Sequence, residues 1–201
     1  MQHTTRTYQT GFLRRYITLA SLIIFGYLLE VTVIPYIRPF GVTPNLLYVI
    51  IGIVTVAYGK LRAFWTGLSF GLLMEIMLPS VTFLNLALYP VTTLFCSFAF
   101  ADKPLKTIEY ERATNKNRRE YPAWLRTVLC TGLNVLIFET VNVTYIYLSG
   151  TTVTALHILK ASGCVLLSCA LCFILLFPLR RLILGKKTDV LVLKNAPAVF
   201  H

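Results

Sequence analysis

The chain has 201 residues, of which 56% are hydrophobic and 13% are charged, and its formal net charge is +11. The charged fraction is about half that of an ordinary soluble domain, and the mean hydropathy of +0.70 is too high for one soluble core. These figures exclude a disordered chain, a collagen-like repeat and a disulfide scaffold, and they predict a polytopic membrane protein. The basic residues lie between long apolar runs, where they set membrane orientation and meet anionic lipid, so we expect no nucleic-acid partner.

Six apolar runs follow one another along the chain and predict an all-α membrane protein, with six transmembrane helices in a single domain of residues 1–201. The runs cover residues 12–36, 44–58, 61–78, 81–101, 124–148 and 155–184. Eighteen residues of helix cover about 27 Å, close to the hydrocarbon thickness of a bilayer. The second run is shorter, so it must thin the bilayer, lean on neighbouring helices or begin before Pro44. The longest polar segment, residues 102–123, is too short to fold alone and is predicted to be a cytoplasmic loop.

The lysine and arginine residues alternate regularly between the two ends of these runs. Seventeen of the nineteen lie at or before the start of the first run, around the junction of the second and third, between the fourth and the start of the fifth, or at or after the end of the sixth; the exceptions are Arg38 and Lys160. Basic residues concentrate on the cytoplasmic side of membrane proteins. The pattern therefore predicts a multi-pass protein with both termini in the cytoplasm.

The third run carries a stripe of small residues that ends in an acid. Ala63, Gly67, Gly71 and Glu75 recur every four residues, so all four lie along one face of a helix. Small residues let another backbone approach closely, which is how helices associate inside a membrane. Two hypotheses follow: the stripe docks a helix of a partner protein, or it packs within the chain with Glu75 bonded to a neighbour.

Further polar residues lie inside the predicted spans, where an ionised group must face protein, water or a partner. They are Glu30, Asn134, Glu139, Asn142 and Lys160. In the fifth span, Asn134, Glu139 and Asn142 favour hydrogen bonds between helices, with a proton or substrate pathway as the alternative. Glu30 is placed to pair with Arg38 at the external interface. Lys160 can extend to the membrane surface or serve one of the acids.

The side chains that carry chemistry do not form a recognisable set in the sequence. No metal-binding set, hydrolase triad or Gly-rich phosphate loop can be assembled from the residues and their spacing. We therefore expect no catalytic residue, no metal and no cofactor, and we predict that the chain is not an enzyme.

Two motifs within residues 34–100 carry a resemblance to a known family. They are Pro44-Asn45-Leu46-Leu47, which follows Pro35 and opens the second span, and Gly67-Leu68-Ser69-Phe70-Gly71-Leu72-Leu73-Met74-Glu75 in the third. This stretch resembles MreD, the integral membrane component of the bacterial rod-shape machinery. The family pattern in the third span is similar: two glycines four apart, two leucines and an acid that is usually Asp, whose place Glu75 takes. The loop after the acid is often Gly-rich in the family, whereas here it is Leu78-Pro79-Ser80.

The resemblance implies a non-enzymatic scaffold of the cell-elongation machinery in the bacterial cytoplasmic (inner) membrane. MreD-like proteins work beside MreC, MreB filaments, RodA and a class B penicillin-binding protein during lateral peptidoglycan synthesis. Their six-helix fold looks like that of the S-components of energy-coupling-factor transporters. On this basis the stripe from Ala63 to Glu75 and its adjoining helices would hold the MreC transmembrane helix. The basic cytoplasmic loops would face the filament and anionic lipid.

Two other function classes stay open. The first is a membrane transport component that binds a small molecule, as S-components do. S-components typically carry Ala-x-x-x-Ala in the first span, but here Ala20 and Ser21 are followed four positions later by Ile24 and Phe25. A bound vitamin, or a neighbouring gene for a coupling ATPase, would favour transport. The second is an intramembrane enzyme centred on Glu139.

Overall fold

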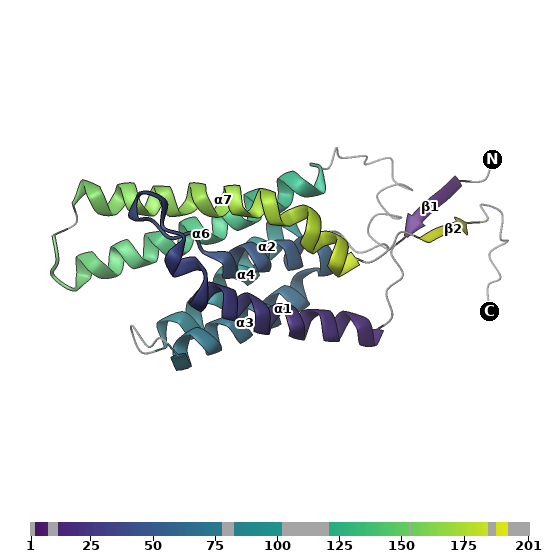
Figure 1. Ribbon diagram of the computed structural model, residues 1–201, viewed down its shortest axis with the longest axis horizontal. Helices are drawn as coiled ribbons and strands as arrows, with labels where there is room; N and C mark the ends of the chain where they lie inside the picture. Colours follow the sequence, from purple (N-terminus) through teal and green to yellow (C-terminus); the bar gives the residue numbers. More distant parts are fainter. Residues whose placement is uncertain are drawn as a thin grey trace.

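The computed structural model describes residues 3–7, 12–77, 83–101, 121–152, 154–184 and 188–192, and within them the helices form one elongated bundle (Figure 1). The helices are α1 (Phe12–Thr32), α2 (Leu46–Tyr58), α3 (Lys60–Met77), α4 (Leu84–Phe100), α6 (Ala123–Leu148) and α7 (Ala155–Leu184), with the short 3-10 turns η1 (Ile34–Tyr36) and η2 (Pro39–Gly41) between α1 and α2. Successive helices run in opposite directions. The end that holds both termini is here called the terminal end, and the end that holds the α6–α7 turn is called the hairpin end (Figure 1).

The prediction of a helical, membrane-compatible chain is confirmed. Within the described residues, three helical segments are long and apolar enough to cross a membrane: Tyr16–Tyr36, Ala123–Leu148 and Ala155–Leu179. Helices α2 and α4 are apolar but shorter. Each helix lies within two or three residues of one predicted run, except that α1 ends at Thr32 and the run continues through η1.

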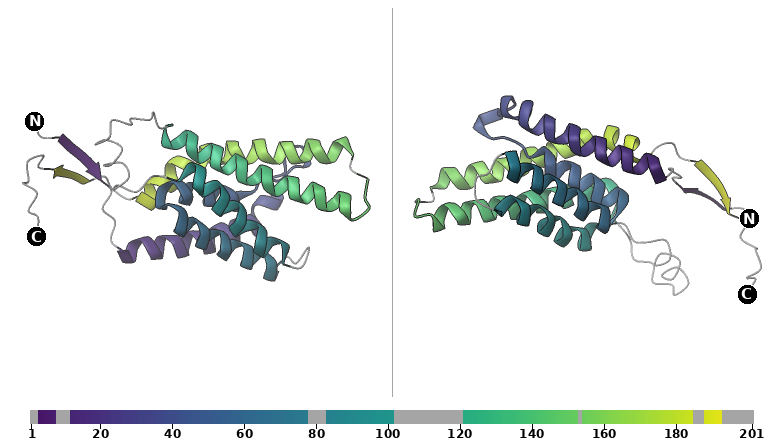
Figure 2. Two further views of the ribbon diagram at one scale, coloured as in Figure 1. Left: turned by 180° about the vertical axis from the view of Figure 1, so that it is seen from behind. Right: turned by 90° about the horizontal axis from the view of Figure 1, so that it is seen from below.

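A two-stranded antiparallel ribbon is the part of the fold that hydropathy did not predict. Strand β1 (His3–Thr7) pairs with β2 (Thr188–Val192), and Thr5 lies opposite Val190. The ribbon lies beyond the terminal end of the bundle (Figure 2). Both strands are outside the apolar runs, where periodicity gives little signal over five residues. Of the predicted loop 102–123, residues 102–120 lie outside the described part of the chain.

Helix α2 is enclosed by the rest of the bundle. It contacts α1, α3, α4, α6 and α7, and its eleven consecutive residues from Leu46 to Val56 are all buried. A helix at the surface of a bundle buries only one side. The short second run is therefore accommodated by leaning on its neighbours, one of the three solutions that its length allowed.

Small side chains and internally bonded hydroxyl groups bring the other helices close to α2. Gly52 faces α6 so closely that a Cβ atom there would overlap the Thr131 hydroxyl group. The Thr131 hydroxyl donates to the Cys172 Sγ of α7, 3.4 Å away. The buried Thr55 hydroxyl donates to the Ile51 carbonyl of its own helix at 2.7 Å. These two hydroxyl groups are thus satisfied without water, as close packing between membrane helices requires.

Candidate functional site

The buried start of α2 is the first place where polar side chains converge. Asn45 caps the helix, because its Oδ1 accepts a hydrogen bond from the Tyr48 N–H at 3.2 Å. Glu30 reaches the same point from α1, and its Oε2 accepts from the Leu46 N–H at 2.9 Å. The first N–H groups of a helix have no partner within the helix, and negative charge is favourable beside them. Glu30 therefore fastens α1 to the start of α2.

The same point is tied to α7 and α4. The Asn45 N–H donates to the Ser168 Oγ of α7 at 2.9 Å. The Tyr89 ring of α4 stacks on the Tyr48 ring, with 4.5 Å between their centroids. Helices α1, α4 and α7 therefore all meet the start of α2. Within the motif of Pro44, Asn45, Leu46 and Leu47, Pro44 and both leucines are buried around this cap.

The expected ion pair between Glu30 and Arg38 is not formed in the structure. The Glu30 carboxylate is directed to the backbone of α2, where it accepts from Leu46, and Arg38 is exposed. No ion pair joins the two among the described residues. The physical reason is that a helix start in an apolar interior offers a carboxylate N–H donors without requiring a cation to be buried.

The small-residue stripe of α3 is covered by α4 of the same chain. Ala63 is fully buried, and Gly67 and Gly71 face the backbone of α4. A Cβ atom at Gly71 would lie only 2.8 Å from the Asn85 carbonyl oxygen. The stripe is thus a packing face within the chain, and a partner helix could reach it only by displacing α4. Leu72, the exposed leucine of the family motif, lies off the stripe.

Glu75 closes the hairpin end of the α3–α4 contact. Its Oε1 accepts from the Phe83 N–H at 2.6 Å. Phe83 directly precedes α4 and has a φ of 62°, in the left-handed region that bulky residues rarely adopt. As with Glu30, a carboxylate on one helix meets the backbone at the start of another.

Glu139, Asn142 and Lys160 come together in a hollow between α6 and α7 near the hairpin end. The hollow has a volume of about 220 Å³, and His157 and residues 41–43 also line it. Cys164 of α7 also lines the hollow. The His157 Nδ1 accepts from the Thr154 N–H at 3.1 Å, so the Nε2 of this ring is the nitrogen that can meet a ligand. The sequence predicted these polar residues but not their meeting, because no helical spacing relates α6 to α7.

Asn134 lies apart from this hollow. It is fully buried on α6, and its Nδ2 donates to the Cys130 carbonyl of its own helix at 2.9 Å. The sequence predicts hydrogen bonds between helices for the polar residues of the fifth span. The Asn134 amide donor instead bonds within its own helix. The three polar residues of that span therefore do not form one site.

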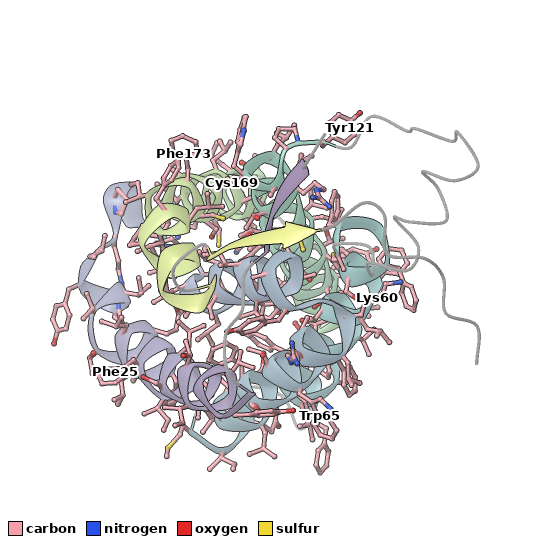
Figure 3. The ribbon with its side chains drawn as sticks, turned by 90° about the vertical axis from the view of Figure 1, so that its right-hand side faces the viewer. Phe25, Lys60, Trp65, Tyr121, Cys169 and Phe173 are labelled. Atoms are coloured by element: carbon pink, nitrogen blue, oxygen red, sulfur yellow. The ribbon has the colours of Figure 1, made fainter. Side chains whose placement is uncertain are left out.

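An apolar groove separates α1 from α3 toward the terminal end. Its volume is about 670 Å³, and Leu19, Ala20 and Ile23 of α1 form one wall, with Trp65 on the opposite wall. Trp65 lies at the rim of the bundle beside α1 (Figure 3). Arg62 also lines the groove. Sequence patterns did not reveal this groove, because they do not tell which neighbouring helices splay apart.

A row of exposed apolar side chains follows the outer side of α4, and it is called here the outer α4 face. Its members are Ala87, Val91, Leu94, Phe95 and Phe98. Their spacing of three or four residues places them along one side of the helix. The Lys60 Nζ lies over the Phe98 ring, 4.4 Å from its centroid.

These arrangements can hold helices together and can bind ligands. In the part of the chain that the structure describes, no group of three or more His, Cys, Asp or Glu residues is placed to hold a metal ion. All five cysteines are free thiols.

Comparison with known proteins finds no matching family model, no similar curated protein and no similar solved structure.

Proposed function

We propose that the chain is a non-enzymatic membrane scaffold of the bacterial rod-shape machinery, of the MreD type, which holds the transmembrane helix of MreC. It lies in the cytoplasmic membrane with six spans and with both termini and residues 102–123 in the cytoplasm. RodA, a class B penicillin-binding protein and MreB filaments are further partners in the same assembly, and anionic lipid meets the basic loops.

The observation that carries this proposal is the use of two acids inside the bundle. Glu30 accepts from the backbone at the start of α2, and Glu75 accepts from the backbone just before α4. In both cases a carboxylate that could serve catalysis or transport instead fixes one helix against another. A molecule whose intramembrane polar groups hold its helices in place is suited to present fixed surfaces to partners.

The direction and packing of the helices support six spans. The bundle alternates in direction, so the odd and even turns lie at opposite ends, as the distribution of basic residues requires (Figure 1). The short α2 is shielded from lipid by five neighbours. Helix α6 has 26 residues, or about 39 Å, and can extend past the roughly 30 Å hydrocarbon layer at the hairpin end.

The docking surface in this proposal is the outer α4 face and not the α3 stripe. Helix α4 is fixed from behind by the glycines of α3 and by Glu75, so its exposed row is held rigidly. Phe95 is 68% exposed and lies between Val91 and Phe98 along one line. A preformed row of this kind lets one partner helix pack along it without a large ordering cost.

Photo-crosslinking in cells tests the proposal. The residue p-benzoylphenylalanine replaces Phe95 or Phe98 on the outer α4 face, and in matched controls it replaces Phe25 of α1 or Phe173 of α7. Phe25 is 64% exposed, so it matches Phe95 in chemistry and accessibility. We expect an adduct with MreC at Phe95 and Phe98 and none at the two controls. An adduct at Phe25 alone would contradict the docking face, and no adduct at any of the four positions would contradict the function.

Small-molecule binding is a second candidate function, and the hollow between α6 and α7 favours it. Lys160 and His157 supply positive or donor groups and Glu139 supplies a carboxyl group, a combination suited to a small zwitterionic or anionic solute. Mass spectrometry of small molecules that co-purify with the chain tests this candidate. We expect the Lys160→Gln variant to lose a bound compound. The Lys60→Gln variant, which makes the same change of charge at the terminal end, should retain that compound. Identical compounds in both variants would exclude the hollow as the binding site.

A further inference from the structure

The groove between α1 and α3 is both apolar and open. Leu19, Ala20 and Ile23 form its α1 wall, and Leu61 and Trp65 contribute the α3 wall. Its volume of about 670 Å³ is within the range of roughly 300–1,000 Å³ that is typical of pockets for organic ligands. The walls offer burial for a hydrocarbon chain.

A basic residue, Arg62, lies at one end of this groove. Arg62 lines it, and its guanidinium group lies 5.3 Å from the centroid of the Tyr58 ring. The first 60 residues contain a single acid, Glu30, which is engaged at the start of α2. Among the described residues no ion pair involves Arg62.

The order of groups along the groove matches the order of groups in a phospholipid. Arg62 lies near the terminal end, and Ser69 is seven residues farther along α3, which corresponds to about 10 Å of helix. Tyr16 and Trp65 are the aromatic types found where lipid headgroups meet hydrocarbon. A spanning helix needs about 30 Å of contact, so a groove of this length suits an acyl chain better than a partner helix.

We propose that the α1–α3 groove binds one anionic phospholipid of the cytoplasmic leaflet. The phosphate meets the Arg62 guanidinium group, and an acyl chain lies against Ala20, Ile23 and Trp65. The proposal rests on the membrane orientation proposed above. It adds a specific lipid site to a scaffold whose protein partner docks elsewhere, on the outer α4 face.

Lipid retention by the purified full chain tests the proposal. The protein is reconstituted in bilayer discs of equal phosphatidylglycerol and phosphatidylethanolamine, extracted mildly, and examined by native mass spectrometry. We expect one retained phosphatidylglycerol per chain. Arg62→Gln should weaken retention roughly fivefold, because one basic residue near an anionic lipid contributes that much. Ala20→Phe should block the acyl chain and abolish retention.

Two matched variants serve as controls. Arg38→Gln removes one positive charge at an exposed position between α1 and α2, and Ala170→Phe adds an aromatic ring at an exposed position of α7. Both should retain phosphatidylglycerol as the wild type does. Equal retention in all four variants would overturn the site, and so would equal retention of phosphatidylethanolamine. If Ala20→Phe does not purify as a folded protein, Arg62→Gln decides the question, since its side chain is at the edge of the bundle.

A photo-crosslinker at Trp65 separates this proposal from the proposed function. An adduct of phospholipid mass supports the lipid site, whereas an adduct of protein mass overturns it and makes the groove a protein interface. The MreC adduct at Phe95 is measured independently. Retention of phosphatidylglycerol without that adduct supports the lipid site and contradicts the scaffold function, and the reverse result contradicts the lipid site alone.

Discussion

Helix α3 makes two contacts of opposite kind on its two sides. Toward α4, Gly67 and Gly71 allow backbone contact so close that no side chain fits between the helices. Toward α1, the larger residues Leu61 and Trp65 hold the helices apart and leave a groove. The comparison teaches that the size of the residues on each face decides whether neighbouring membrane helices close or leave room for a ligand. The closed contact should therefore determine stability, and the open contact should determine binding.

The most direct way to break this comparison is to enlarge a residue on the closed side. Gly71→Leu places side-chain atoms against the Asn85 carbonyl oxygen and should lower the free energy of unfolding by about 3 kcal/mol or more. Ser69→Leu enlarges a residue of the same helix on the side that faces the groove. It should change the free energy of unfolding by less than about 1 kcal/mol. Unfolding in mixed micelles with increasing denaturing detergent measures both. Equal losses would show that the groove is packed as tightly as the stripe.

Replacing Glu75, the acid at the end of the stripe, should have the next largest effect on stability. Glu75→Leu leaves the Phe83 N–H without its acceptor and should lower the free energy of unfolding by about 2 kcal/mol. Glu75→Gln keeps an acceptor oxygen at the same distance and should lose less than half of that. The same unfolding assay compares the two variants. A loss of the same size in both would mean that charge, and not the hydrogen bond, is what matters at this position.

The smallest expected change is an increase in stability from a substitution just before α4. Phe83 has a φ of 62° and an exposed side chain, so Phe83→Gly relieves the backbone with little loss of packing. We expect the free energy of unfolding to rise by about 1 kcal/mol. Phe83→Ala keeps the Cβ atom and should bring no such gain. A gain in the alanine variant as well would assign the effect to the aromatic ring.

The sequence predicted those features that depend on one helix at a time. The spacing of Ala63, Gly67 and Gly71 gave a correct packing face, although not its occupant. The brevity of the second run left support from neighbouring helices as one of three solutions, and the burial of residues Leu46 to Val56 identifies it as the one adopted. The alternation of basic residues agrees with the directions of the helices in the bundle (Figure 1).

Features that join distant parts of the chain could not be predicted in this way. The hydrogen bond from Asn45 to Ser168 links residues 123 positions apart, and no periodicity relates them. Glu30 was assigned to Arg38 because opposite charges were the available signal, whereas its true partner is a backbone N–H group, which has no sequence signature. The hollow at Lys160 and the groove at Trp65 depend on the angles between helices, which composition does not specify.

The enclosure of α2 has a consequence for how the protein is made. Two of the five helices that surround it, α6 and α7, are synthesised last. While the ribosome is still producing them, the flank of α2 that they later cover has to remain against lipid or the insertion machinery. Maturation of this bundle therefore waits for its C-terminal half, and a nascent chain that stalls after α4 would present an unfinished surface to membrane proteases.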